Sequence, residues 1–433
     1  MSSYKKNSIT LIGAVGLGTG VMISAGIFAL LGQIAELSSK WFPLIFVLGA
    51  IVTAFSAYSY KKYSEHYPSA GGIGMYLVKA YGKNAFATLG ALMMILSMVI
   101  NQSLVAKTFG SYLMQLFGGA ENNWIIPLLG LGLLSFSLVV NLSSNFFIQT
   151  FTSIASLVKI LGLLLFSFAG LYAANFVVSF AETTSQSPDL SPMHYLASIA
   201  LAIVAFKGFT TITNNGEEIK QPKKNVGRAI MISIAISLLI YLAISLAVSS
   251  SLSVSDIIAA KDYALAEAAR PVFGVFGLWF TVMLAIIATV TGIIASVFAV
   301  SRLIAMLADM DMIPHKQVIK DARTQQQTIF YTVGIAMMLT VLFDLTRIAS
   351  LGAILYLAMD MMIHFGLAVK LKDTVDAKPW IVWSAFVLDA IILTAFLYIK
   401  VTSDLLVVLV AIVLTLSLYV MQKVYLDRKE EAN

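Results

Sequence analysis

The stretch GLGTGVMISAGIF, from Gly16 to Phe28, is apolar enough to cross a membrane, yet it contains four glycines and a serine in thirteen residues. Glycine inside a helix costs about 0.5–1 kcal/mol relative to alanine, so a continuous helix gains nothing from this composition. Two interpretations are open. Either the small residues let neighbouring helices approach closely, or the helix is interrupted near its middle.

The composition of the whole chain indicates a polytopic membrane protein. Apolar residues make up 59% of the 433 residues and charged residues only 12%, which is too apolar for a soluble protein of this size. The apolar residues recur in blocks of about 20 or more, the length that crosses a hydrocarbon core of about 30 Å. The blocks predict an all-α protein with twelve transmembrane helices, at about 9–35, 41–60, 84–117, 124–143, 149–175, 193–215, 226–251, 271–308, 328–344, 347–370, 380–400 and 404–426.

The distribution of positive charge predicts the orientation. With the N-terminus in the cytoplasm, most of the 28 Lys and Arg residues fall on the cytoplasmic side, as the positive-inside rule requires. We therefore expect a multi-pass protein of the cell membrane with both termini in the cytoplasm. The net charge of +6 reflects this asymmetry, and no basic patch indicates a nucleic-acid partner.

A second interruption lies roughly 180 residues after the first. In AIVAFKGFTTITNNG, Lys207 and Gly208 break the apolar run of the sixth predicted span. Interrupted spans at matching places in two halves are typical of inverted-repeat transporters, whose discontinuous helices hold the substrate near the midplane. The predicted organisation is one transmembrane domain with repeat one at 9–175, repeat two at 193–370, and two further helices at 380–426.

Backbone groups freed at the two interruptions predict how a ligand is held. Unwinding a helix in lipid exposes N–H and C=O groups that cost several kcal/mol each unless they are hydrogen-bonded. Free N–H groups at a half-helix start suit a carboxylate, and freed carbonyls suit an ammonium. The predicted binding residues at the first interruption are Ile23, Ser24, Ala25, Gly26 and Ile27. Those at the second are Ile203, Val204, Ala205, Phe206, Lys207 and Gly208.

Four motifs, in order and spacing, resemble those of amino acid permeases of the amino acid, polyamine and organocation superfamily. They are ISAGIF at 23–28, YPSAGGIGMYLVKAYG at 67–82, AFKGFTTITNNGEEIKQPKKNVGRAI at 205–230 and SRLIAMLADMDMIP at 301–314. The resemblance implies the twelve-helix, five-plus-five inverted repeat of leucine-type transporters, with helices 1 and 6 discontinuous. It also implies movement of amino acids or amines by symport or exchange, and an aromatic gate at Phe206.

Lys159 is the predicted coupling residue. It lies in the middle of the fifth span, where a charge costs about 2.5–3.5 kcal/mol on insertion scales, and such residues are functional candidates. It can act as a proton site, or as a structural ammonium that caps carbonyls of span 1. Several proton-coupled members of the family carry lysine at this place, so the resemblance favours protons over sodium.

Three other polar groups leave alternatives open. Lys207 can contact a ligand's acidic group, face a water-filled vestibule, or pair with Asp360 or Asp389. Asp360 and His364, at i and i+4, share a helix face and can relay protons or form an interhelical pair. Glu217 and Glu218, near Lys220, Lys223 and Lys224, form either an inner gate or an ordinary solvated loop.

Other functional classes lack their signatures. The sequence has no HExxH, no GxSxG and no P-loop, so we expect neither an enzyme nor an ATP-driven pump. We expect no cofactor and no metal site. The predicted partners are a small-molecule amino acid or amine, protons and the lipid bilayer. The alternatives are an amino acid exchanger and a nutrient sensor on a transporter fold.

Overall fold

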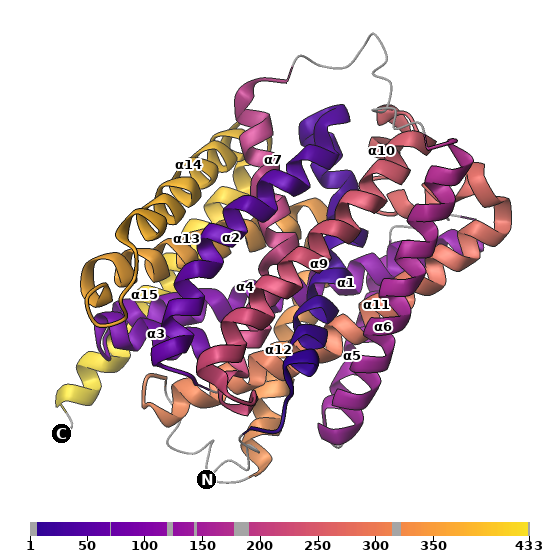
Figure 1. Cartoon of the computed structure of the whole chain (residues 1–433). Helices are drawn as coiled ribbons and strands as arrows, with labels where there is room; N and C mark the ends of the chain where they lie inside the picture. Colours follow the sequence, from indigo (N-terminus) through magenta and orange to yellow (C-terminus); the bar gives the residue numbers. More distant parts are fainter. Residues whose placement is uncertain are drawn as a thin grey trace.

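The computed structural model describes residues 7–69, 71–118, 124–142, 145–176, 190–313 and 322–431. These residues form a bundle of helices, with one isolated parallel bridge between Ile9 and Ile219. Both termini lie at the same end of the bundle (Figure 1). We call this the terminal end and the other the opposite end.

Every predicted span falls on a helix. The long helices are α1 (Leu11–Ser38), α2 (Phe42–His66), α4 (Ala85–Met114), α5 (Ile125–Asn141), α6 (Asn145–Ala173), α7 (Pro192–Phe206), α9 (Pro222–Ser251), α11 (Ala264–Asp309), α12 (Ala322–Leu342), α13 (Leu345–Gly366), α14 (Pro379–Ser403) and α15 (Leu405–Glu431). Shorter elements between them include α3 (Gly72–Tyr81), α8 (Thr210–Asn214), α10 (Val254–Ala259), and the 3-10 turns η3 (Lys207–Phe209) and η4 (Gly216–Glu218).

Local sequence signals explain where several helices begin. Thr10, Asn84 and Asp344 cap α1, α4 and α13, because each side-chain oxygen accepts a hydrogen bond from a backbone N–H of the first turn. Proline lies at the start of α7, α9 and α14, where its missing N–H costs nothing. Helix α11 begins at Ala264, earlier than predicted, and it bends at Gly274, which has a φ of 57°.

Nine stretches of the described residues are long and apolar enough to cross a membrane. Leu11–Ser24, Ile125–Asn141 and Gln327–Leu342 are shorter apolar helices. Only 22% of the most apolar window of α15 is buried, whereas 94% is buried in the stretch Pro192–Asn214. Apolar surface as continuous as that of α15 requires lipid or protein around it, so the structure is that of a polytopic membrane protein. Twelve complete crossings remain a prediction.

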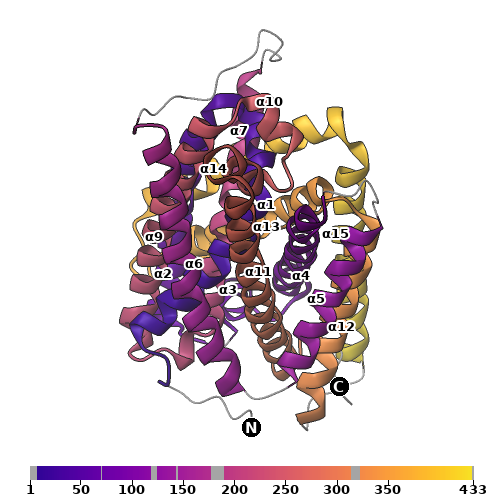
Figure 2. The same ribbon diagram turned by 90° about the vertical axis from the view of Figure 1, so that its right-hand side faces the viewer.

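Helices α1 and α7 lie together inside the bundle. Helix α1 packs against α7, α9, α11 and α6, and α7 also packs against α14 and α2. Figure 2 shows α11 running through the middle of the bundle between α6 and α4. The two stretches that the sequence singled out as interrupted are therefore brought side by side in the core.

Candidate substrate site

The first interruption is a local break in α1 at Ile23, which has φ −83° and ψ 48°. The three carbonyls just before it are each hydrogen-bonded by a side chain. Lys159 Nζ of α6 donates to Gly20 O at 2.6 Å, Ser24 Oγ donates to Val21 O at 2.5 Å, and Tyr241 Oη of α9 donates to Met22 O at 2.6 Å. Because carbonyls without partners are costly in an apolar interior, these side chains stabilise the broken helix.

The second interruption is tighter than the sequence suggested. Instead of an unwound segment, Phe206 is followed by the 3-10 turn η3 and then by α8. A 3-10 turn keeps backbone groups hydrogen-bonded at i+3, so it frees fewer carbonyls than unwinding would. Ala205 O still lies 3.1 Å from Tyr241 Oη, the hydroxyl that also contacts Met22 O. One tyrosine thus bridges the two interruptions.

Two glycines let the interrupted segments touch. A Cβ at Gly26 would collide with the Tyr241 hydroxyl and lie 2.9 Å from Ala205 O. A Cβ at Gly208 would lie 2.6 Å from the backbone nitrogen of Met22. Since both distances are too short for real Cβ contacts, only glycine fits at these positions.

A small cavity lies at this contact. It offers about 20 Å³ to the centres of water molecules, which is room for about one water and far less than an amino acid needs. Five of the predicted binding residues line it: Gly26, Val204, Ala205, Lys207 and Gly208. The other predicted residues with described side chains are buried without lining it, namely Ile23, Ser24, Ile27, Ile203 and Phe206. Ala25 belongs to α1, but its side chain lies outside the described part of the structure.

Sequence reasoning did not place six lining residues in the site: Val21, Met98, Asn101, Thr210, Thr211 and Ser296. Met98 and Asn101 belong to α4, and Ser296 belongs to α11. Thr211 Oγ1 is buried with no hydrogen-bond partner among the described residues. For Thr210 and Thr211 the available signal was the run of polar residues that follows Gly208 and continues into α8.

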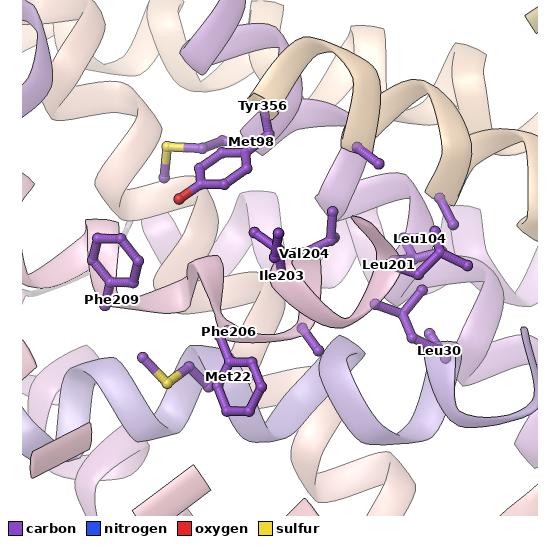
Figure 3. Close-up of a cluster of buried hydrophobic side chains, with 14 of the residues drawn as sticks. Met22, Leu30, Met98, Leu104, Leu201, Ile203, Val204, Phe206, Phe209 and Tyr356 are labelled. Atoms are coloured by element: carbon purple, nitrogen blue, oxygen red, sulfur yellow. The ribbon is translucent and has the colours of Figure 1, made fainter. Parts of the chain in front are cut away.

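Phe206 points away from the cavity lining. Its ring is fully buried and packs against the ring of Tyr241, with centroids 5.0 Å apart. In the close-up, Phe206 and Met22 lie together on one side of α7, and Met98 and Tyr356 lie on the other (Figure 3).

Lys159 is fully buried in α6. Besides Gly20 O, its ammonium lies 3.2 Å from Thr291 Oγ1 of α11. The sequence predicted that an ammonium at this position could cap carbonyls of span 1, and the observed partner is Gly20, three residues before the break. Lys159 therefore connects α6 and α11 to the broken part of α1.

Lys207 is also buried, and it lines the cavity. Its Nζ lies 3.2 Å from Ser97 O and 3.1 Å from Ser97 Oγ, and it lies 5.8 Å from the centre of the Tyr356 ring. Of the partners considered from sequence, neither Asp360 nor Asp389 is the one observed. The observed partner is Ser97 in α4.

A set of polar contacts lies at each end of the bundle. At the terminal end, Glu218 forms a buried ion pair with Arg302 of α11. The neighbouring Lys220, Lys223 and Lys224 are exposed, and Arg302 is a partner that the sequence did not indicate. The preceding Glu217 is half-buried, and its carbonyl accepts from Asn7 N at 3.3 Å, while Ile9 N donates to Glu218 O at 2.8 Å.

At the opposite end, Gln33 of α1 donates to Asp262 at 2.9 Å and accepts from Thr346 of α13 at 2.8 Å. Lys261 pairs with Glu36 at 2.9 Å. Burial raises the pKa of Asp262, and the neighbouring Lys261 opposes this effect. Asp262 therefore titrates at a higher pH than an exposed aspartate.

These features define a class: a polytopic membrane protein with two interrupted helices in contact around a small cavity, and with polar contacts at each end of the bundle. The comparisons give the family. A family model described as amino acid permease matches residues 9–428. The chain belongs to the amino acid permease family, which is a family of transporters and not of enzymes.

Its relatives agree with that assignment. The chain is 27% identical over 389 residues to the inner membrane transport protein YbaT of Escherichia coli, covering 89% of this chain and 88% of the relative. It is 23% identical to the serine/threonine exchanger SteT of Bacillus subtilis, over 86% of this chain and 85% of the relative. It is 25% identical to cationic amino acid transporter 4 of Homo sapiens, over 51% of this chain and 37% of the relative.

Proposed function

We propose that the protein is a secondary active transporter that moves amino acids across the cell membrane by alternating access, with a proton as the coupling ion. The observation that carries the proposal is the contact from Lys159 to Gly20 O, which attaches an ionisable side chain to the broken helix beside the cavity. Twelve crossings, two inverted repeats of five helices each and cytoplasmic termini complete this proposal.

The cavity chemistry supports an amino acid as the substrate. The freed end of α1 after Ile23 suits a carboxylate, because helix N-termini present free N–H groups. Ala205 O is a candidate acceptor for an ammonium, and the unpartnered Thr211 Oγ1 is a further polar contact. Since the cavity is smaller than an amino acid, binding requires the side chains around it to move apart.

The polar contacts at the two ends support alternating access, because each set could hold its end closed in one conformation. Breaking the Glu218–Arg302 pair would open the terminal end, and breaking the contacts of Gln33 and Glu36 would open the other. Phe206, buried against Tyr241, would act as a gate only after rotating away from it. The rate at which bound substrate leaves Phe206→Leu protein tests that role, because leucine keeps the apolar character of the side chain.

Proton coupling follows from the surroundings of Lys159. Burial favours its neutral form, whereas the bond to Gly20 O favours the ammonium. Opposed effects of this kind let protonation change as α1 moves between conformations. A proton can then travel with the substrate.

Exchange is the alternative mode, and SteT, a relative, is named as an exchanger. Counterflow in proteoliposomes preloaded with single amino acids or polyamines identifies the substrate. Concentrative uptake into empty proteoliposomes then separates symport from exchange and from a sensor, because a sensor binds without accumulating its ligand. If no amino acid or amine supported counterflow or uptake, the transport proposal would fail.

A further inference from the structure

A second set of ionisable side chains is buried away from Lys159, where α2, α13 and α14 meet. Asp360 and His364 lie on α13, and Asp389 lies on α14. All three are fully buried. His364 Nε2 lies 3.6 Å from Asp360 Oδ2 and 3.3 Å from Asp389 Oδ2. The imidazole thus lies between two carboxyl groups.

The two carboxyl groups differ in their hydrogen bonds. Asp360 accepts from Ser56 Oγ at 2.7 Å and from Tyr60 Oη at 2.6 Å, both on α2. Beyond the contact of Oδ2 with His364 Nε2, neither oxygen of the buried Asp389 has a hydrogen-bond partner among the described residues. Asp389 thus has fewer and longer polar contacts than Asp360, and its burial favours the neutral form.

The charge balance of the three side chains also favours a neutral Asp389. With a protonated His364 and two ionised carboxyl groups, the three side chains carry a net charge of −1, and a buried unpaired charge is expensive. The other ionisable groups that face them are the phenols of Tyr60, Tyr356 and, next to Tyr60, Tyr76. Neutral phenols supply no countercharge. One further proton on Asp389 brings the net charge to zero.

We propose that Asp360, His364 and Asp389 form a second proton-binding site, in which Asp389 gains and loses the proton. Ser59 Oγ, 2.9 Å from His364 Nδ1, fixes the orientation of the imidazole. This proton-binding site does not depend on which substrate the protein carries.

Two aromatic contacts connect this site to the candidate substrate site. The Tyr60 ring, whose hydroxyl is bonded to Asp360, packs edge-on against Phe209 of η3 with centroids 5.0 Å apart. The Tyr356 ring lies 5.8 Å from Lys207 Nζ. Movement of η3 during transport therefore changes the surroundings of Asp360, and through His364 those of Asp389.

Infrared spectroscopy of the purified full-length protein tests the proposal without any transport assay. A protonated carboxyl group has a C=O stretch that a carboxylate lacks. We expect such a band in the wild type at neutral pH and its loss in Asp389→Asn. The matched control is Asp427→Asn, an exposed acid at the end of α15, which should leave the band unchanged.

His364→Gln provides a second variant in case Asp389→Asn does not fold. Removing the imidazole leaves two carboxyl groups that both need protons for neutrality, so the band should grow. Absence of the band from the wild type, or its persistence in Asp389→Asn, would overturn the proposal. So would stoichiometric zinc in the purified wild type that is lost from Asp389→Asn, because the three side chains would then hold a metal ion.

Discussion

At the scale of single residues, the hydroxyl of Tyr241 is the most consequential group that the sequence did not reveal. Met22 and Tyr241 lie 219 positions apart, and nothing in the pattern around Tyr241 marks it as a partner of a broken helix. By contrast, the sequence already marked Gly26 and Gly208 as places where helices approach closely or are interrupted, because both glycines lie inside apolar runs.

We expect Tyr241→Phe to destabilise the protein by about 1–3 kcal/mol, since a buried carbonyl at Met22 loses its donor. Thermal unfolding of the detergent-solubilised protein measures this loss as a lower Tm. The matched control is Tyr398→Phe in α14, where the side chain is 59% exposed and the change should be small. A Tyr241→Phe variant as stable as the control would show that the bond to Met22 O does not support the break.

Gly26→Ala should weaken substrate binding at least tenfold, which corresponds to about 1.4 kcal/mol. The added methyl group collides with the Tyr241 hydroxyl and crowds Ala205 O, and therefore occupies the contact between the two interruptions. The affinity for the amino acid identified by counterflow is the measurement. Gly16→Ala is the control, because a Cβ at Gly16 has nothing within 4 Å. Equal affinities in the two variants would remove Gly26 from the site.

At the scale of elements, the sequence predicted where helices lie better than what happens inside them. The apolar blocks located each long helix because burial in lipid demands length and low polarity. The same blocks did not reveal that the second interruption is a 3-10 turn, since this depends on packing of η3 against α1. The partner of Glu218 was also missed, because Arg302 comes from a distant helix while three lysines lie close in sequence.

We expect Glu218→Gln to destabilise the protein by about 3–5 kcal/mol, because it removes the carboxylate that forms a buried ion pair with Arg302. A double-mutant cycle with Arg302→Gln should show strong coupling in thermal unfolding. Glu65→Gln is the control, since Glu65 pairs with Lys61 and Lys62 at a partly exposed position where pairs contribute about 1 kcal/mol or less. If the losses of stability in the two single variants simply added up in the double variant, the ion pair would not stabilise the terminal end.

At the scale of the whole molecule, the structure brings an interrupted α1 and an interrupted α7–α8 together at one small cavity, and the buried Lys159 contacts α1 just before its break. Membership in the amino acid permease family indicates amino acids as the substrate class, and the proposed proton coupling rests on the contact between Lys159 and Gly20 O. The sequence pointed to Lys159 because a charge in mid-span is costly. That Gly20 O is its partner could be seen only in the structure, because the two residues lie on different helices.

Uptake into proteoliposomes with an imposed proton gradient, for wild type and Lys159→Ala, tests the central claim most directly. Wild-type uptake should rise with an inward gradient, collapse with a protonophore, and be unaffected when potassium replaces sodium. Lys159→Ala should lose the response to pH while keeping counterflow, and the exposed Lys223→Ala should behave as wild type. Strictly sodium-dependent uptake with no response to pH would contradict the account and leave Lys159 as a structural clamp on α1.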